Sequence, residues 1–212
     1  MKLFIDSADP KQVRDAVATG VVDGVTTNPK LLARSDRAPA DLVPELCALV
    51  RGPVSVPVRA RASDSIVEEG LALARLHERV VVKVPVHADG LRAIARLRGE
   101  GVRTHATLCC SPNQALLAAK CGAYFVSPFV GRSEDLGGSG LELVAQIIEI
   151  LDNYEFETQV MVASVRNPVH VQESALLGAD ACTMPWSVLQ ALAHHPLTDR
   201  LDEEQRRAWS QG

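Results

Sequence analysis

Eight short apolar runs, rich in β-branched residues, alternate with helix-like stretches along the chain, and this alternation limits the possible folds more than any other feature. Several runs are apolar at nearly every position, as in Val80–Val86, which reads Val-Val-Val-Lys-Val-Pro-Val. Strands covered on both faces by crossover helices need this pattern, so we expect parallel pairing. The eight expected strands are Lys2–Asp6, Gly24–Asn28, Val54–Ala60, Val80–Val86, Arg103–Cys110, Tyr124–Val130, Gln159–Ser164 and Ala181–Trp186.

Helix boundary signals separate these runs. A capping side chain precedes a proline that can take the first helical position at Asp9-Pro10, Ser111-Pro112 and Asn167-Pro168. Glycines that can end a helix in the left-handed conformation are Gly20, Gly122 and Gly178.

Eight βα units in 212 residues predict one α/β domain over residues 1–212, a (β/α)₈ barrel with few insertions. Residues 199–212 are expected to form a C-terminal helical extension that docks on a partner subunit. A doubly wound open sheet is the alternative. It is disfavoured because neither G-x-G-x-x-G nor G-x-x-x-x-G-K-[ST] follows any expected strand.

Composition excludes several classes of function. The formal net charge is -4 at pH 7, so no basic face for nucleic acid or an anionic membrane is implied. No apolar run approaches the ~18 residues of a membrane span, and we expect a soluble, cytoplasmic protein. The five cysteines include no C-x-x-C pair, so neither a disulfide framework nor a zinc knuckle is expected.

Lys83 is the first candidate for catalysis. Arginine is the usual cation of this chain, with 17 Arg and five Lys, yet the most apolar strand carries a lysine. Burial of an amine lowers its pKa and favours the neutral form that attacks carbonyls. The alternative is a lysine at the strand end that extends to solvent.

Other polar residues end neighbouring strands, and a barrel brings such ends to one mouth. Asp6 ends the first strand, where it could move a proton on a substrate held by Lys83, or simply form a turn or helix cap. Gly24–Pro29 contains two hydroxyls and an amide suited to a polyol, although Asn28-Pro29 is also an ordinary turn.

The ends of the sixth and seventh expected strands predict a phosphate site. Arg132 follows one, while Ser164 and Arg166 follow the other, and both lead into helix N-termini. Surface arginines on loops are the alternative interpretation.

These residues together resemble the transaldolase family, specifically its short members and the related fructose-6-phosphate aldolases. The matching stretches cover almost the whole chain: Phe4-Ile-Asp6, Asp23-Gly-Val-Thr-Thr-Asn-Pro29, Val82-Lys-Val-Pro85 with Gly90-Leu91, Thr107-Leu108 with Asn113-Gln-Ala-Leu-Leu-Ala-Ala119, Ser127-Pro-Phe-Val-Gly-Arg132, Ala163-Ser-Val-Arg-Asn-Pro168, Thr183-Met-Pro185 and His195-Pro-Leu-Thr198.

The resemblance implies a barrel of the class I aldolase kind in which Lys83 forms a Schiff base with a ketose donor. It implies proton transfer by Asp6 and a catalytic water held by Thr107. The other implied roles are donor binding by Thr26 and Asn28 and phosphate binding by Arg132, Ser164 and Arg166. Short members of the family form pentamers or decamers, which implies a homo-oligomer. No metal or organic cofactor is expected.

The chain departs from the family pattern at three positions. Pro57 stands where transaldolases have a glutamate that acts with the catalytic water, and His105 replaces an asparagine. Phe129, expected at the substrate, stands where the aldolase branch has a tyrosine. His105 and Thr107 lie two apart, so they share a face of their strand, and His105 could reach the same water as a proton shuttle. The alternative is a hydrogen-bonded core histidine.

The sequence therefore predicts a transaldolase-like enzyme acting on sugar phosphates. One alternative is an aldolase-like lyase or an enzyme for a different donor. Another is a catalytically impaired protein that only binds sugar phosphates, because the phosphate residues are complete and the acid–base set is not.

Overall fold

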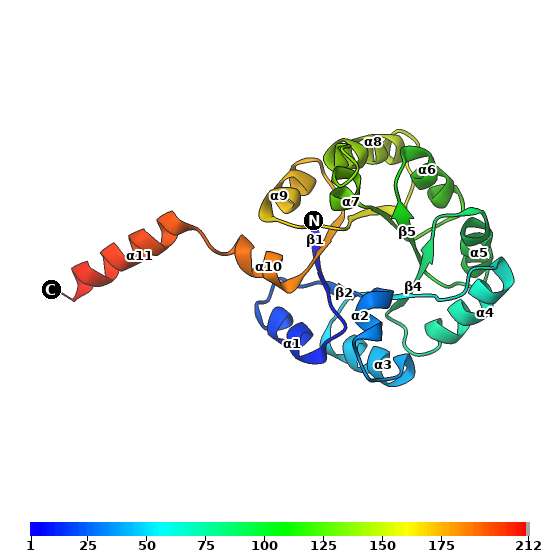
Figure 1. Cartoon of the computed structure of the whole chain (residues 1–212), viewed down its shortest axis with the longest axis horizontal. Coiled ribbons are helices and arrows are strands. Elements are labelled where there is room, and N and C mark those ends of the chain that lie inside the picture. Colours follow the sequence, from blue (N-terminus) through cyan, green and yellow to red (C-terminus); the bar gives the residue numbers. More distant parts are fainter. Residues whose placement is uncertain (211–212) are drawn as a thin grey trace.

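The structure is a computed structural model and describes residues 1–210. Eight parallel strands close into a barrel in chain order, with helices around its outside (Figure 1). Closure is made by β1 and β8, which pair in parallel from Lys2 with Ala181 to Ile5 with Met184. The predicted (β/α)₈ barrel is confirmed, and the open doubly wound alternative is wrong.

The strands are β1 (Lys2–Asp6), β2 (Gly24–Thr26), β3 (Val54–Pro57), β4 (Val80–Pro85), β5 (Thr104–Cys109), β6 (Phe125–Pro128), β7 (Gln159–Val162) and β8 (Ala181–Met184). The helices are α1 (Pro10–Ala18), α2 (Pro29–Ala33), α3 (Pro39–Leu49), α4 (Ser63–Ala74), α5 (Ala88–Gly99), α6 (Pro112–Lys120), α7 (Val130–Glu134), α8 (Gly140–Asn153), α9 (Pro168–Leu176), α10 (Trp186–Leu192) and α11 (Pro196–Trp209).

Several strands end earlier than their sequences predict, because helices begin at once. Asn28 is already the N-cap of α2, Val130 starts α7 and Trp186 starts α10. The three capping pairs identified in the sequence do start α1, α6 and α9, each with the cap side chain accepting a backbone N–H. The strand carboxyl ends therefore pass within a few residues into helix N-termini.

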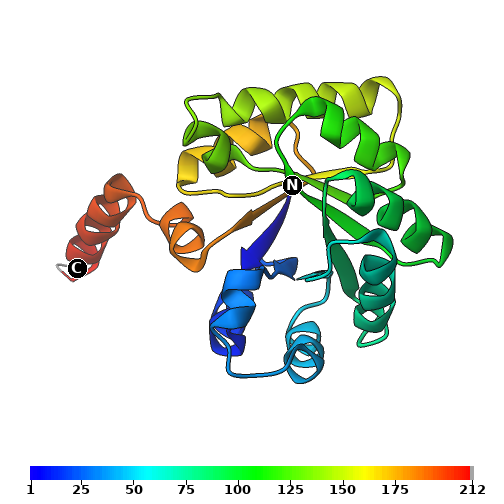
Figure 2. The same ribbon diagram turned by 45° about the vertical axis from the view of Figure 1, so that its right-hand side comes forward.

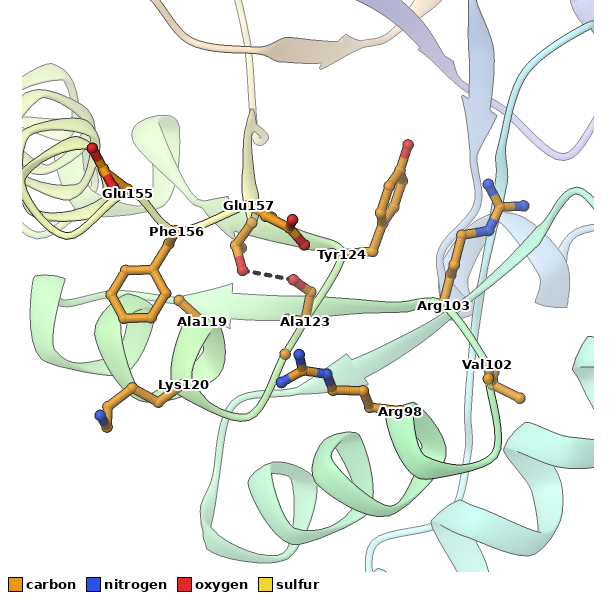
Figure 3. A pocket seen from close by; sticks show the side chains of 13 residues that line it. Arg98, Val102, Arg103, Ala119, Lys120, Ala123, Tyr124, Glu155, Phe156 and Glu157 are labelled. Carbon is orange, nitrogen blue, oxygen red and sulfur yellow. Dashed lines mark hydrogen bonds between the residues drawn. The ribbon is translucent and has the colours of Figure 1, made fainter.

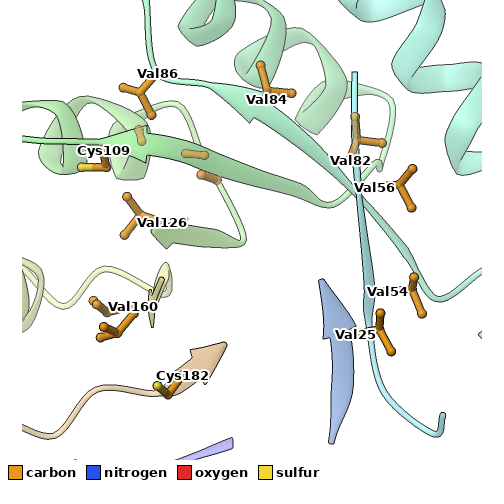
Figure 4. Packing of buried hydrophobic residues seen from close by; sticks show 14 of the residues in the cluster. Val25, Val54, Val56, Val82, Val84, Val86, Cys109, Val126, Val160 and Cys182 are labelled. Atoms are coloured by element: carbon orange, nitrogen blue, oxygen red, sulfur yellow. The ribbon is translucent and has the colours of Figure 1, made fainter. Parts of the chain in front are cut away.

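Alternate residues of each strand serve two separate cores. One set points outward to the helices and is rich in valine, as Figure 4 shows for Val54, Val56, Val82 and Val84. The other set points into the barrel and forms a small apolar plug, which consists of Phe4, Val81, Phe125, Met161 and Ala181. Phe4 and Val81 of the plug lie two residues before Asp6 and Lys83 on their strands, so the plug lies nearer the strand starts and these two polar residues lie nearer the strand ends.

The last helix, α11, projects from the barrel in both ribbon views (Figure 2). It contains no buried residue. It begins at Pro196, three residues before the expected start of the extension, because His195 caps it through Nδ1. The last two residues of the expected extension, 211–212, lie outside the described residues. Within residues 1–210, no helix is long and apolar enough to cross a membrane.

Candidate active site

Lys83 lies inside the barrel, on β4. Its side chain does not extend to the outer surface of the barrel, since the residue is only 6% exposed. Nζ donates a hydrogen bond to the carbonyl oxygen of Thr27 at 3.1 Å. Burial lowers the pKa of Lys83 below its ordinary value, while the nearby charge of Asp6 opposes that shift. The lowered pKa favours the neutral amine, which is the nucleophilic form.

Asp6 ends β1 and accepts two hydrogen bonds from neighbouring side chains. Thr26 Oγ1 donates to Oδ1 at 2.9 Å, and Asn28 Nδ2 donates to Oδ2 at 3.1 Å. Burial raises the pKa of Asp6, and the charge of Lys83 and the two hydrogen bonds partly reverse the shift. Helix α1 is capped by Asp9. Asp6 is therefore free of the capping role and faces the barrel interior.

Thr26 connects Asp6 to the last strand. Its hydroxyl has one proton, which goes to Asp6, so the 2.6 Å contact with Thr183 requires the Thr183 hydroxyl to donate to Thr26. Thr26 is completely buried below the cavity, whereas Thr183 lines it. Of the two, only Thr183 can touch a ligand in this arrangement. Thr26 instead orients the Asp6 carboxylate.

A cavity of about 440 Å³ opens above Lys83 and Asp6 where the strands end. Seven of the ten site residues expected from the sequence line it: Asp6, Asn28, Lys83, Thr107, Phe129, Arg132 and Ser164. Thr26, His105 and Arg166 lie outside this lining. Among the described residues, Asp6 is the one carboxylate of the lining, and Pro57 occupies the end of β3.

The hydroxyl of Thr107 is buried beside this cavity without a hydrogen-bond partner among the described residues. Buried hydroxyls are nearly always paired, with protein or with ordered water. Thr107 lines the cavity, so a water or a ligand hydroxyl there could form a hydrogen bond with its hydroxyl group. This geometry is compatible with the expected role of Thr107.

His105 lies deeper, and both of its ring nitrogens are engaged. Ser127 Oγ donates its single proton to the Met161 carbonyl at 2.7 Å. It must therefore accept from His105 Nε2 at 2.6 Å, which places the ring proton on Nε2. Nδ1 then accepts from the Ser55 hydroxyl at 2.7 Å. The chain of hydrogen bonds fixes one neutral tautomer.

Charge on His105 is also disfavoured. The residue is fully buried, and burial together with the positive charge of Lys83 holds its pKa well below the ordinary value of 6.5. His105 and Thr107 do share the inner face of β5, but two residues separate them by about 6.6 Å along the strand. The proton-shuttle role stays a prediction, and the geometry favours the alternative of a hydrogen-bonded core histidine.

The two expected phosphate arginines meet at the carboxylate of Asp135, directly after α7. Arg166 Nη1 and Nη2 contact Asp135 Oδ1 and Oδ2, each at 2.6 Å. Arg132 Nη1 lies 3.5 Å from Oδ2 of the same residue. The hydrogen bonds from Arg166 hold the pKa of Asp135 below its ordinary value. Arg132 reaches the cavity rim, while Arg166 lies just behind it.

A larger cavity, about 730 Å³, lies at the opposite end of the barrel, before β5, β6 and β7 begin (Figure 3). Arg98, Arg103, Tyr124 and Glu157 are among its lining residues. Its one lysine, Lys120, is exposed at the end of α6, whereas Lys83 is buried. Chemistry rather than size therefore identifies the smaller cavity as the candidate active site.

Three contacts around the cavity do not follow from the expected site residues. For Thr183 the sequence does carry an indication, because it is a threonine within the apolar run Ala181–Met184. The pairing of Asp135 with Arg166 and the contacts of Ser55 and Ser127 with His105 join residues that are far apart in sequence. Only the folded barrel brings these residues together.

Comparisons with known proteins find similarity over almost the whole chain. The family model described as Transaldolase/Fructose-6-phosphate aldolase matches residues 3–211. A probable transaldolase of Myxococcus xanthus (strain DK1622) is 54% identical over 200 residues, which is 94% of this chain and 90% of that protein. A probable transaldolase of Geotalea uraniireducens (strain Rf4) is 52% identical over 94% of this chain and 93% of its own. One of Desulforapulum autotrophicum is 50% identical over 99% of this chain and 97% of its own.

Proposed function

Because the chain belongs to the transaldolase/fructose-6-phosphate aldolase family, we propose that Lys83 forms a Schiff base with a phosphorylated ketose and that the enzyme moves a dihydroxyacetone-type unit. The observation that carries this proposal is the buried Lys83 amine, which shares a cavity of about 440 Å³ with the half-buried carboxylate of Asp6.

The chemistry follows from these two groups. Asp6 takes a proton from the Lys83 ammonium, and the resulting neutral amine attacks the ketone carbon to form a C–N bond. The ketone oxygen takes one proton from the attacking nitrogen and the other back from Asp6, and it leaves as water to give an iminium. The iminium accepts the electron pair of the C3–C4 bond as this bond breaks. The proton of the C4 hydroxyl must then leave, and the Asp6 carboxylate is the base within the cavity. The resulting enamine adds to an aldehyde acceptor, or it is protonated and hydrolysed.

The remaining lining residues divide between the two ends of the substrate. Asn28 and Thr183 lie beside Asp6 and suit the hydroxyls of the donor unit. Thr107, with its unpartnered hydroxyl, suits the water that is lost and regained. Arg132 and Ser164 at the rim, with Arg166 behind them, suit the phosphate, and Phe129 forms an apolar wall between the two ends.

Borohydride trapping tests the proposal. With fructose 6-phosphate or dihydroxyacetone present, reduction should add the mass of the reduced donor to the peptide that contains Lys83. Lys83→Met should lose both the adduct and turnover while it keeps the fold, because methionine has similar length and no charge. Lys120→Met, which removes an exposed lysine, is the matched control and should retain both.

Acceptor dependence separates transfer from cleavage. A transferase releases little free dihydroxyacetone without an aldose phosphate acceptor, whereas a lyase releases it at the same rate with or without one. We propose transfer, and acceptor-independent release would assign the lyase reaction instead. Reduction that labels another lysine, or none, would contradict the Schiff-base proposal itself.

A further inference from the structure

Asp135 is the one carboxylate that contacts both expected phosphate arginines within the described part of the chain. It is the residue at the C-terminal end of α7, and it faces the loop that follows β7. Arg166 meets it end-on, with one terminal nitrogen on each carboxylate oxygen at 2.6 Å. Arg132 approaches one of those oxygens at 3.5 Å. The carboxylate thus bridges the arginine on α7 and the arginine of the neighbouring loop.

The backbone supports the same arrangement of Arg166. Gly131 has no side chain, and a Cβ there would lie 2.5 Å from Arg166 Nε and 2.9 Å from its Cδ. The Gly131 N–H donates to the Ser164 carbonyl at 3.2 Å, which ties α7 to the loop after β7. Ser164 itself has a φ of 60°, so this loop is held in a conformation that a serine rarely adopts. Arg166 therefore lies across the first turn of α7.

The end-on pairing leaves donors for a ligand. It uses two of the five N–H groups of Arg166, so the other three have no role in this contact. Arg132, Arg166 and Lys30 together carry three positive charges, and Asp135 and Glu134 carry two negative charges, so the rim keeps a net positive charge that suits a phosphate dianion. Without Asp135, the two arginines would repel each other, and each would have to be ordered when the phosphate binds.

We propose that Asp135 is a positioning residue for the phosphate, which holds Arg166 and Arg132 in place before the substrate arrives and so favours phosphorylated over unphosphorylated substrates. This inference rests on the proposed function of both arginines. The direction in which phosphate affinity changes when Asp135 is replaced distinguishes this role from a purely electrostatic one. Removal of a negative charge should by electrostatics alone tighten phosphate binding, whereas the loss of a positioning group should weaken it.

The test is Asp135→Asn, which keeps the size of the side chain and removes its charge and one acceptor. We expect KM for the phosphorylated donor and the inhibition constant of inorganic phosphate to rise by about tenfold, near the low end for a charge-assisted hydrogen bond. kcat should stay unchanged, and so should both constants for unphosphorylated donors. Asp64→Asn, which breaks the surface pair of Arg96 with Asp64, is the matched control and should change none of these.

Two further variants separate the outcomes. If Asp135 acts through Arg166, then Asp135→Asn in an Arg166→Ala background should add little to the effect of Arg166→Ala alone. Tighter phosphate binding by Asp135→Asn, or equal losses for both kinds of donor, would overturn the positioning role. If Arg132→Ala and Arg166→Ala leave phosphate binding intact, both the phosphate site and this inference are wrong. If these two variants weaken phosphate binding and Asp135→Asn does not, only the positioning role of Asp135 is wrong.

Discussion

His105 can adopt one tautomer only within the barrel, because Ser127 has a single proton and gives it to Met161. We therefore predict that the imidazole is neutral with its proton on Nε2 at pH 6 and above. Burial and the positive charge of Lys83 both hold its pKa well below 6.5, so it should stay neutral at a pH where an ordinary histidine is largely protonated. NMR of ¹⁵N-histidine-labelled protein measures tautomer and charge directly, and His105→Asn identifies the signal by its absence. An imidazolium signal at pH 6, or a proton on Nδ1, would return His105 to the role of proton shuttle.

Asn28 offers a test of Asp6 as the base. Its Oδ1 accepts the N–H groups of Lys30 and Leu31 at the start of α2, so its amide nitrogen must face Asp6. Asn28→Asp keeps the helix cap, but it replaces a donor to Asp6 with a second negative charge. The pKa of Asp6, already raised by burial, should rise further.

The pH profile shows this change. If ionised Asp6 takes the proton, kcat falls as pH drops through its pKa, and Asn28→Asp should move that acidic limb upward by about one pH unit or more. Ser139→Asp places a carboxylate at the N-cap of α8 and is the control for a new capping charge. An acidic limb that stays in place would mean that another group sets it.

The sequence alone was enough to predict several of the residues that line the cavity. Asp6 and Asn28 stand out because they end apolar strands, whose ends meet at the barrel mouth, and Lys83 stands out because it is a lysine within the most apolar strand. How deep each side chain lies along the barrel axis was not predictable in the same way. Alternation puts His105 and Thr107 on one face of β5, but it does not show that Thr107 lines the cavity while His105 lies below it.

At the level of elements, helix starts were predictable and irregular strand ends were not. Capping side chains before proline act locally, so a sequence reveals them without knowledge of the fold. The irregularity in β5 depends on its neighbour. Pairing of β5 with β6 shifts register between Ala106 and Cys109, and Leu108 has a φ of 60° there. No local signal marks this, because leucine is a poor residue for the left-handed region.

Leu108 gives a stability prediction at this irregularity. The residue is 50% exposed, so its backbone conformation should matter more than its packing. Asparagine tolerates the left-handed region and valine does not, so Leu108→Asn should stabilise the fold by about 0.5–1 kcal/mol and Leu108→Val should destabilise it. Thermal unfolding should then shift by roughly 2–4 °C per kcal/mol for a chain of this size. Equal losses in both variants would show that the leucine side chain is what matters.

For the whole molecule, α11 is the part that a single barrel does not explain. The helix lies away from the barrel in both ribbon views, and three i,i+4 ion pairs along it are Arg200–Glu204, Asp202–Arg206 and Glu203–Arg207. Such pairs contribute only about 0.2–0.5 kcal/mol each, and isolated helices of this length are marginal in water. Leu197 and Leu201, one turn apart, are each 45% exposed, and Trp209 is 82% exposed. The helix therefore needs an apolar partner surface.

We predict that this partner is a second copy of the chain and that the protein is a homo-oligomer, a pentamer or decamer. Exchange of α11 between neighbours would cover Leu197 and Leu201 without any change in the barrel. Sedimentation velocity should give the mass of that assembly for the unmodified chain. It should give a smaller species for Leu197→Glu combined with Leu201→Glu, because each buried leucine contributes about 1.5–3 kcal/mol and a buried glutamate is costly. Arg206→Ala, on the opposite face of the helix from Leu197, should leave the mass unchanged. A monomer at every concentration of the unmodified chain would show that α11 does not pack on a neighbouring copy.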